Sequence, residues 1–235
     1  AFTRALAPGD VRGIVIVQPN NPTGSMLDDS ELDFLFEQAH AAGATVIADE
    51  VFLDFPAPGR ELTTLAAGAT VPLLVLSGLS KCAGLPQMKL GWMVAAGPPA
   101  PAEQLMQGLE WIADAFLSVG APVQAAGALF LAGRHDFIAA TRARCDANEA
   151  YLDRLLTGTP VTRLPREGGW SIILRLPATR TDDAWCFELL EAGVVAHPGH
   201  YYDVMKESLL VLSLLAPENE WADGLERLLG VVGPG

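Results

Sequence analysis

Positive charge is scarce in this chain. Lys and Arg together number 15 against 28 Asp and Glu, which gives a formal net charge of −13. Clustered Lys and Arg bind the phosphates of nucleic acids and the anionic surfaces of membranes, so the composition argues against both partners. No apolar run reaches the roughly 18 residues of a membrane span, and no signal peptide is visible. We therefore expect no nucleic-acid partner and no membrane association.

Cysteine is also sparse. Cys82, Cys145 and Cys186 are the three cysteines, and they are widely spaced. An odd, sparse set fits a reducing cytosol better than a disulfide framework. No Cys/His cluster has the spacing of metal ligands. The sequence thus predicts a cytoplasmic protein without a metal site.

The chain also lacks an initiator Met and enters a strand pattern within its first residues. We interpret it as a fragment, a cleaved product or a trimmed chain. Its 235 residues, half of them hydrophobic, suffice for one large or two modest globular domains with a sizeable core.

Strand and helix patterns alternate in the first part of the chain. A capping box at Asp28 and Glu31 predicts a helix that ends at Gly43. Apolar runs predict buried strands at 11–17, 44–48, 71–76 and 90–95. This alternation predicts an α/β domain, with a mixed, mostly parallel sheet covered by helices.

The remainder predicts a small α+β domain. Residues 102–156 are largely helical in pattern, with breaks near 120–122 and at Gly133. Further strands are expected at about 161–164, 170–176, 193–196 and 209–214, and helices at about 182–191 and 218–230. We place the domains at 1–132 and 133–235, joined by a long helix that starts near Gly133.

Lys81 is the most informative residue. It is one of three lysines and follows the predicted strand 71–76 in a turn of small residues. A lysine at the end of a strand, beside hydroxyls, can capture a carbonyl as a Schiff base. Asn21 and Asp49 also fall at or just past strand ends, where ligands of parallel sheets collect. The three side chains are expected at one rim.

Several segments resemble the ordered signature of class I/II aminotransferases, which are pyridoxal-phosphate enzymes of fold type I. They are Asn21-Pro22-Thr23-Gly24, Asp49-Glu50-Val51-Phe52, Ser80-Lys81, Lys89-Leu90-Gly91-Trp92 and Gly168-Gly169-Trp170. Each motif alone is weak, but their order and gaps match. The resemblance implies a fold type I large domain that is N-terminally incomplete, plus a small C-terminal domain.

The resemblance implies a role for each predicted site residue. Lys81 would form the Schiff base with pyridoxal 5'-phosphate and then act as general acid and base. Asp49 would pair with the pyridine nitrogen and keep it protonated, which makes the ring an electron sink. Asn21 would hydrogen-bond the phenolic oxygen of the cofactor, although Asn-Pro is also ordinary turn chemistry.

The phosphate of the cofactor would be held by Lys89, where the family usually has arginine. Lysine binds phosphate as a point charge, without a bidentate fork. Ser77 and Ser80 are candidate contacts to the phosphate or to Lys81. A plain polar turn is nearly as good an interpretation of these two serines.

The sequence departs from the family pattern at two further side chains. Phe52 stands where many members carry a tyrosine that donates to the phenolic oxygen, and phenylalanine cannot donate. Val211 stands where an arginine normally grips the substrate carboxylate. Arg163 and Arg166 flank the Gly168-Gly169 segment and could compensate, or they could simply be solvated. Gly169 and Trp170 are further candidates for substrate binding.

The resemblance also implies chain that this sequence does not contain. The family's large domain begins well upstream of residue 11 and supplies a glycine-rich phosphate segment and an aromatic that stacks on the ring. Members are usually dimers with active sites at the interface. A homodimer, or a partner chain that supplies the N-terminal part, is therefore expected.

The predicted function is an aminotransferase that moves an amino group between an amino acid and a 2-oxo acid through Lys81. A lyase or decarboxylase on the same scaffold is an alternative that fits the loss of the carboxylate-binding arginine. A non-catalytic effector-sensing domain and a degenerate subunit remain two further alternatives.

Overall fold

The computed structural model describes residues 11–203 and 208–233, so Lys206 lies outside it. The described chain forms two compact units, which are treated separately below. The first unit contains 11–20, 26–54 and 61–138, and the second contains 21–25, 55–60, 139–203 and 208–233. The predicted domain boundary falls between Ala132 and Gly133, where one helix ends.

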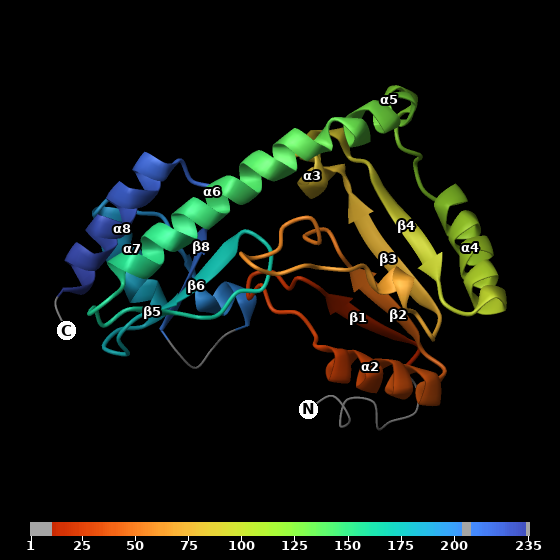
Figure 1. The fold of residues 1–235 in the computed structure, drawn as a ribbon, viewed down its shortest axis with the longest axis horizontal. Helices are drawn as coiled ribbons and strands as arrows, with labels where there is room; N and C mark the ends of the chain where they lie inside the picture. Colours follow the sequence, from red (N-terminus) through yellow and green to blue (C-terminus); the bar gives the residue numbers. More distant parts are fainter. Residues whose placement is uncertain (1–10, 204–207, 234–235) are drawn as a thin grey trace. The chain divides into compact units, whose positions relative to one another are not determined.

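The first unit is built on a four-stranded sheet with the order β1-β2-β3-β4 (Figure 1). The strands are β1 (Gly13–Val17), β2 (Thr45–Asp49), β3 (Leu73–Gly78) and β4 (Gly91–Ala96). β1, β2 and β3 are parallel, and β4 runs antiparallel to β3. The predicted mixed, mostly parallel sheet is confirmed.

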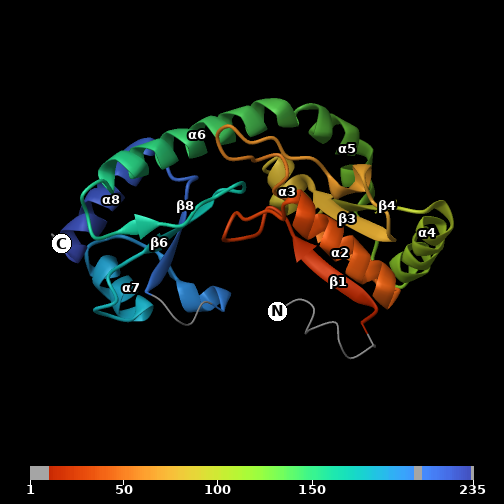
Figure 2. The same ribbon diagram turned by 60° about the horizontal axis from the view of Figure 1, so that its bottom comes forward.

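Helix α2 (Asp29–Ala42) covers one face of this sheet. Asp28 accepts a hydrogen bond from Glu31 N while the Glu31 side chain accepts from Asp28 N, and Gly43 ends the helix with φ 63°. Leu35 and Ala39 pack against strand residues such as Val46, and Figure 2 shows α2 lying across the strands. The capping box and the glycine stop are as predicted.

Three longer helices follow, with breaks where the sequence predicts them. They are α4 (Pro99–Asp114), α5 (Ala121–Ala132) and α6 (Arg134–Leu155), and α4 runs beside β4 (Figure 1). The short helical turns are η1 (Leu65–Ala67), α3 (Leu79–Cys82), η2 (Pro86–Met88) and η3 (Gly199–Tyr202).

The second unit packs helices on one face of an antiparallel sheet with the order β5-β6-β8-β7. Its core joins Leu174 and Leu210 of the sheet to Trp185, Leu152 and Leu225 of the helices. The strands are β5 (Thr162–Arg163), β6 (Ser171–Arg175), β7 (His197–Pro198) and β8 (Leu209–Ser213). In addition to α6, this unit contains the helices α7 (Asp182–Glu191) and α8 (Glu218–Val232).

The strand predicted at 193–196 is wrong. The end of α7 takes its backbone donors instead, because Gly193 N donates to Leu190 O and Val194 N to Leu189 O. A donor used to close a helix is not free for a sheet ladder. Pairing with β8 begins only at His197, which lies opposite Val211.

Among the described residues, no helix is long and apolar enough to cross a membrane.

Candidate active site

The strand register of the first unit brings several predicted residues to one edge of the sheet. Asp49 ends β2 and lies opposite Val17 and Leu76, the neighbouring parallel strands' residues. Ser77 lies one residue further along β3 and opposite Trp92 of β4. The carboxyl ends of the parallel strands therefore meet here, at the usual ligand edge of such sheets.

Lys81 extends this edge because α3 begins directly after β3 (Figure 1). Its Nζ atom lies 5.5 Å from the centroid of the Phe52 ring. Phe52 is 4% exposed and follows β2 in the turn that begins at Asp49. A lysine ammonium over an aromatic face gains about 0.5–2 kcal/mol, so Phe52 supports this position of the side chain. Ser80 precedes Lys81 in the same helical turn.

The Asp49 carboxylate is held by its own turn. Its Oδ1 atom accepts a hydrogen bond from Val51 N at 3.1 Å. The next acid, Glu50, is buried and accepts from Leu65 N at 2.8 Å. Burial raises the pKa of Glu50, while that hydrogen bond partly opposes the rise. The two adjacent acids thus have different hydrogen-bond partners, and the bond of Glu50 links the turn to η1.

Cys82, next to Lys81, is not a competing nucleophile. It is buried, and burial followed by the charge of Asp54 raises the pKa of its thiol. A protonated thiol is a poor nucleophile, so burial argues against Cys82 as a reactive group.

Lys89 lies at the same edge, just before β4. It ends η2 in the left-handed region with φ 51°, and its side chain is exposed.

The backbones of β3 and β4 approach each other closely at Gly78, because a Cβ on Gly78 would lie 2.9 Å from Leu90 O and 3.0 Å from Gly91 Cα. Only glycine fits this approach.

Asn21 belongs to the second unit, in a loop that is hydrogen-bonded to the segment around Gly168 and Gly169. Gly24 O accepts hydrogen bonds from Glu167 N at 2.9 Å and Gly168 N at 3.0 Å. The Ser171 hydroxyl donates to Asn21 Oδ1 at 3.4 Å. The structure therefore brings Asn21 together with the predicted substrate segment, although they lie far apart in sequence.

Gly169 and Trp170 are fixed by a third segment. Gly169 N donates to Phe55 O at 2.8 Å, and the ring centroids of Trp170 and Phe55 lie 5.0 Å apart. Phe55 was not predicted, because nothing in its local sequence pattern marks a partner so distant in the chain.

Arg166 is not solvated. Its side chain is 1% exposed and pairs with Glu149 of α6. Its Nε atom lies 3.2 Å from Glu149 Oε2, and Nη1 donates to Gly169 O at 2.5 Å. Arg163 instead binds both carboxylate oxygens of Asp153, at 2.5 and 2.9 Å. Glu149 was missed because it sits in a helix with no motif around it.

Val211 is packed among apolar side chains. It is 7% exposed in β8 and clusters with Ile173 and Leu209, against Leu164 and Tyr202. A side chain of this kind binds no carboxylate.

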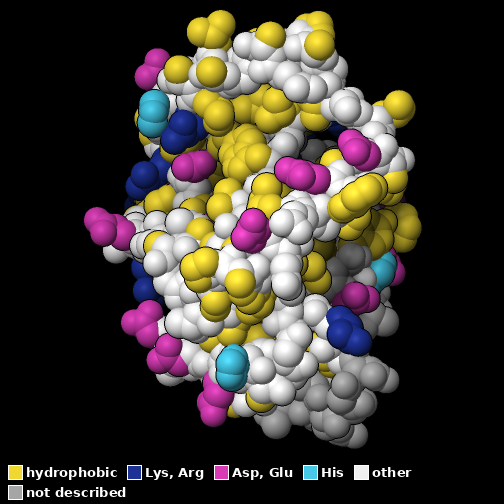
Figure 3. Space-filling view, turned by 90° about the vertical axis from the view of Figure 1, so that its right-hand side faces the viewer, with side chains coloured by type: hydrophobic (Ala, Val, Ile, Leu, Met, Phe, Trp, Pro, Cys, Tyr) yellow, Lys and Arg dark blue, Asp and Glu magenta, His cyan; other side chains and the backbone are white. Residues whose placement is uncertain are grey.

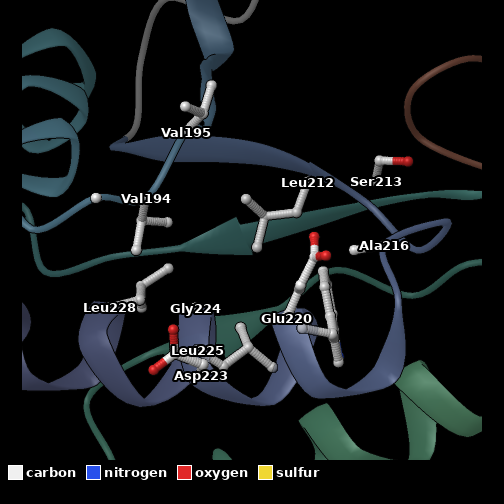
Figure 4. Close-up of a pocket in the computed structure, with 12 residues that line it drawn as sticks. Val194, Val195, Leu212, Ser213, Ala216, Glu220, Asp223, Gly224, Leu225 and Leu228 are labelled. Atoms are coloured by element: carbon white, nitrogen blue, oxygen red, sulfur yellow. The ribbon is translucent and has the colours of Figure 1, made fainter.

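One cavity of about 400 Å³ opens in the second unit between α8 and β8 (Figure 4). Leu212 points toward α8, and the Glu220 carboxylate points back from α8. Apolar side chains such as Val194 and Leu225 form much of its wall. None of the predicted site residues lines it.

A second group of polar side chains gathers at the start of α7. One carboxylate oxygen each of Asp182 and Asp183 and a ring nitrogen of His200 lie within 4.8 Å of one another. They already bind each other, since His200 Nδ1 lies 3.2 Å from Asp182 Oδ2, which also accepts from His200 N at 3.0 Å. This contact pairs two segments that sequence spacing does not connect.

Comparison with known proteins agrees with this architecture. Residues 1–227 match the family model described as aminotransferase class I and II. The Escherichia coli K12 glutamate-pyruvate aminotransferase AlaA is 34% identical over 122 residues, which are 52% of this chain and 30% of that protein. The valine–pyruvate aminotransferase of Mycobacterium tuberculosis is 25% identical over 229 residues, which are 93% and 56%.

Solved structures give the same result for the fold. The N-succinyldiaminopimelate aminotransferase of M. tuberculosis superimposes with a TM-score of 0.77 at 26% identity, over 98% of this chain and 61% of that one. An E. coli aminotransferase gives 0.81 at 22% identity, over 96% and 58%. This chain spans less than two thirds of each of these relatives. The chain belongs to the aminotransferase class I and II family and has the fold type I architecture.

Proposed function

We propose that the protein is a pyridoxal-phosphate-dependent aminotransferase that exchanges an amino group between an amino acid and a 2-oxo acid. One observation carries the proposal. Two adjacent parallel strands put a carboxylate, Asp49, at the end of β2 and an amine, Lys81, just beyond the end of β3. Family membership adds independent support.

The donor set at this edge fits pyridoxal phosphate. The cofactor has an aldehyde, a pyridine nitrogen and a phosphate, which need an amine, an acid and a cation. Lys81, Asp49 and Lys89 provide these three groups around one sheet edge. We further assign Ser77 and Ser80 to the phosphate, and Asn21 to the phenolic oxygen.

The bound cofactor would supply an electron sink for the carbanion formed at the substrate's α-carbon. Lys81 would hold the cofactor covalently through Nζ, and after its release Nζ would carry the proton between carbon atoms as a base and then as an acid. Asp49 would keep a proton on the ring nitrogen, because its negative charge favours the protonated form. Lys89 would neutralise phosphate charge.

The proposal is tested by following the two half-reactions on the full-length protein. An amino acid should convert the cofactor to its amine form, which changes its absorbance spectrum, and a 2-oxo acid should restore the first spectrum. Binding without any spectral conversion by a panel of amino acids would contradict the aminotransferase function and favour an effector-sensing domain or a degenerate subunit.

A second candidate function is a lyase or decarboxylase on the same scaffold. The observation that favours it is Val211, which is buried in an apolar cluster where the resemblance would place a carboxylate-binding arginine. An enzyme that removes the substrate's carboxylate does not need an arginine that binds this group tightly. Release of ammonia or CO₂, without formation of the amine form of the cofactor, would identify this chemistry.

Phe52→Tyr should lower the pH midpoint of the bound cofactor's absorbance titration by about one unit. A tyrosine hydroxyl can donate to the phenolic oxygen and stabilise its ionised form, and one unit corresponds to about 1.4 kcal/mol, typical of a hydrogen bond to a charged group. Spectrophotometric titration measures the midpoint. Phe36→Tyr, on an aromatic packed against the sheet core, is the control. Coincident curves for Phe52→Tyr and the wild type would defeat the assignment of Phe52.

We also propose that a second copy of the chain covers hydrophobic surface on the first unit. Trp111, Phe116 and Leu117 are 80%, 72% and 101% exposed. Figure 3 looks onto the side that carries α4 and shows hydrophobic side chains gathered there. Exposed apolar patches of this kind mark interaction sites.

The cysteines are free, which supports the predicted cytoplasmic location.

Light scattering of the full-length protein should give the mass of a dimer. Replacing both Trp111 and Leu117 by glutamate should shift the mass toward a monomer, because charges on an apolar interface lose their hydration. Phe187→Glu, on an exposed residue of α7, should leave the dimer intact. A monomeric wild type, or a dimer that tolerates both glutamates, would rule out this surface.

A further inference from the structure

Arg166 supports the loop that carries Asn21. Gly24 lies so close to Arg166 that a Cβ on Gly24 would be 2.6 Å from Arg166 Cγ and 2.6 Å from Gly168 O. Gly24 also has a φ of 67°, which favours glycine. The backbone of the loop therefore rests directly on the arginine stem.

The guanidinium of Arg166 is held on both sides. Glu149 accepts from Nε and Nη2, and Gly169 O accepts from Nη1. Glu149 itself is buried in α6. A buried arginine with these partners is fixed in one geometry. If it released its donors to a substrate, the buried Glu149 carboxylate would keep only its longer contact with Arg163 Nη1 at 3.4 Å.

The same segment orients the Asn21 side chain. Ser171 donates to Asn21 Oδ1, so the acceptor end of the amide is engaged. This leaves Nδ2, the donor end, for an oxygen of a ligand. Backbone bonds from Glu167 and Gly168 to Gly24 O complete the support.

We propose that Arg166 is a positioning residue that, anchored by Glu149, holds the Asn21–Gly24 loop so that the Asn21 amide presents its donor to the cofactor. This inference rests on the proposed function, in which Asn21 binds the phenolic oxygen. It assigns Arg166 to the support of a cofactor contact and not to the substrate carboxylate.

The test is a spectrophotometric pH titration of the full-length protein with pyridoxal phosphate bound. Asn21→Ala removes the donor and should raise the midpoint by about one unit. Arg166→Met and Gly24→Ala should raise it in the same direction. Neither should raise it further when combined with Asn21→Ala, because residues that act through one contact are not additive.

Arg163→Met is the matched control. Arg163 Nη1 lies 3.4 Å from the same Glu149, but Arg163 binds chiefly Asp153. The atoms nearest to a Cβ on Gly24 belong to Arg166 and Gly168 instead. Its titration midpoint should equal that of the wild type. Thermal unfolding should confirm that each variant is folded. If Arg166→Met does not fold, Gly24→Ala and Arg166→Lys still test the proposal, and the lysine should give a smaller shift.

Wild-type midpoints in folded Arg166→Met and Gly24→Ala would overturn the inference. So would a variant of Arg166 that raises KM for the amino acid while the midpoint stays unchanged, since that result assigns Arg166 to the substrate. Failure of the proposed function has a different signature. A wild-type protein without any absorbance band that depends on Lys81 would overturn both.

Discussion

Replacing Lys81 by alanine should abolish the visible absorbance band of bound pyridoxal phosphate and lower transamination by at least about 10²–10⁴-fold, the usual contribution of a positioned acid/base. The expected loss is large because one Nζ atom serves both as the covalent anchor and as the proton carrier. The neighbouring Cys82 is buried with a raised thiol pKa and cannot replace it. Absorbance spectra and steady-state rates of the full-length protein measure the two effects.

Lys81→Arg is the control that separates charge from chemistry. Arginine keeps the positive charge over the Phe52 ring, but its guanidinium stays protonated and forms no covalent link with an aldehyde. The arginine variant should therefore be as colourless and inactive as the alanine variant. Recovery of the band in Lys81→Arg would show that charge alone binds the cofactor.

Asp49→Asn should leave the cofactor bound at Lys81 but slow transamination by about 10²-fold or more. A carboxylate within hydrogen-bond reach of the pyridine nitrogen changes its pKa by about 1–3 units in favour of the protonated form. An amide of the same shape keeps the packing and the bond from Val51 N but loses this charge. Single-turnover kinetics of the amino-acid half-reaction measures the effect on chemistry apart from binding.

Glu50→Gln is the matched control for Asp49→Asn. Glu50 is the adjacent acid, but it is buried and accepts from Leu65 N, a bond that the glutamine amide oxygen can also accept. Its half-reaction should proceed at nearly the wild-type rate. An equal loss of rate in both variants would mean that the turn as a whole is disturbed and that Asp49 has no special role.

The fold of the first unit could be predicted because its signals are local. A capping box at Asp28 and a glycine at 43 define α2, and the apolar runs give the four strands. Those signals depend on neighbouring residues only. The strand predicted at 193–196 failed for the opposite reason, since Val194 N is taken by Leu189 O, a competition that hydrophobicity does not reveal.

The candidate site was predictable only in part. Lys81 and Asp49 are marked by their places at the ends of apolar strands, and in the structure Asp49 ends β2 while Lys81 follows the adjacent β3. The support of Asn21 is different, because Glu149, Arg166 and Gly24 come from three separate segments. Their contacts arise from tertiary packing, and no periodicity or motif encodes such a pairing.

The central claim is that Lys81 Nζ holds a vitamin B6 aldehyde covalently. The most direct measurement is to treat the full-length protein with pyridoxal phosphate and then with borohydride, which fixes the link, and to locate the modified residue by peptide mass spectrometry. A phosphopyridoxyl group on Lys81, absent from protein that was first treated with a competing amine, is the predicted result. A label on Lys89 instead, or no label on any lysine, would contradict the account.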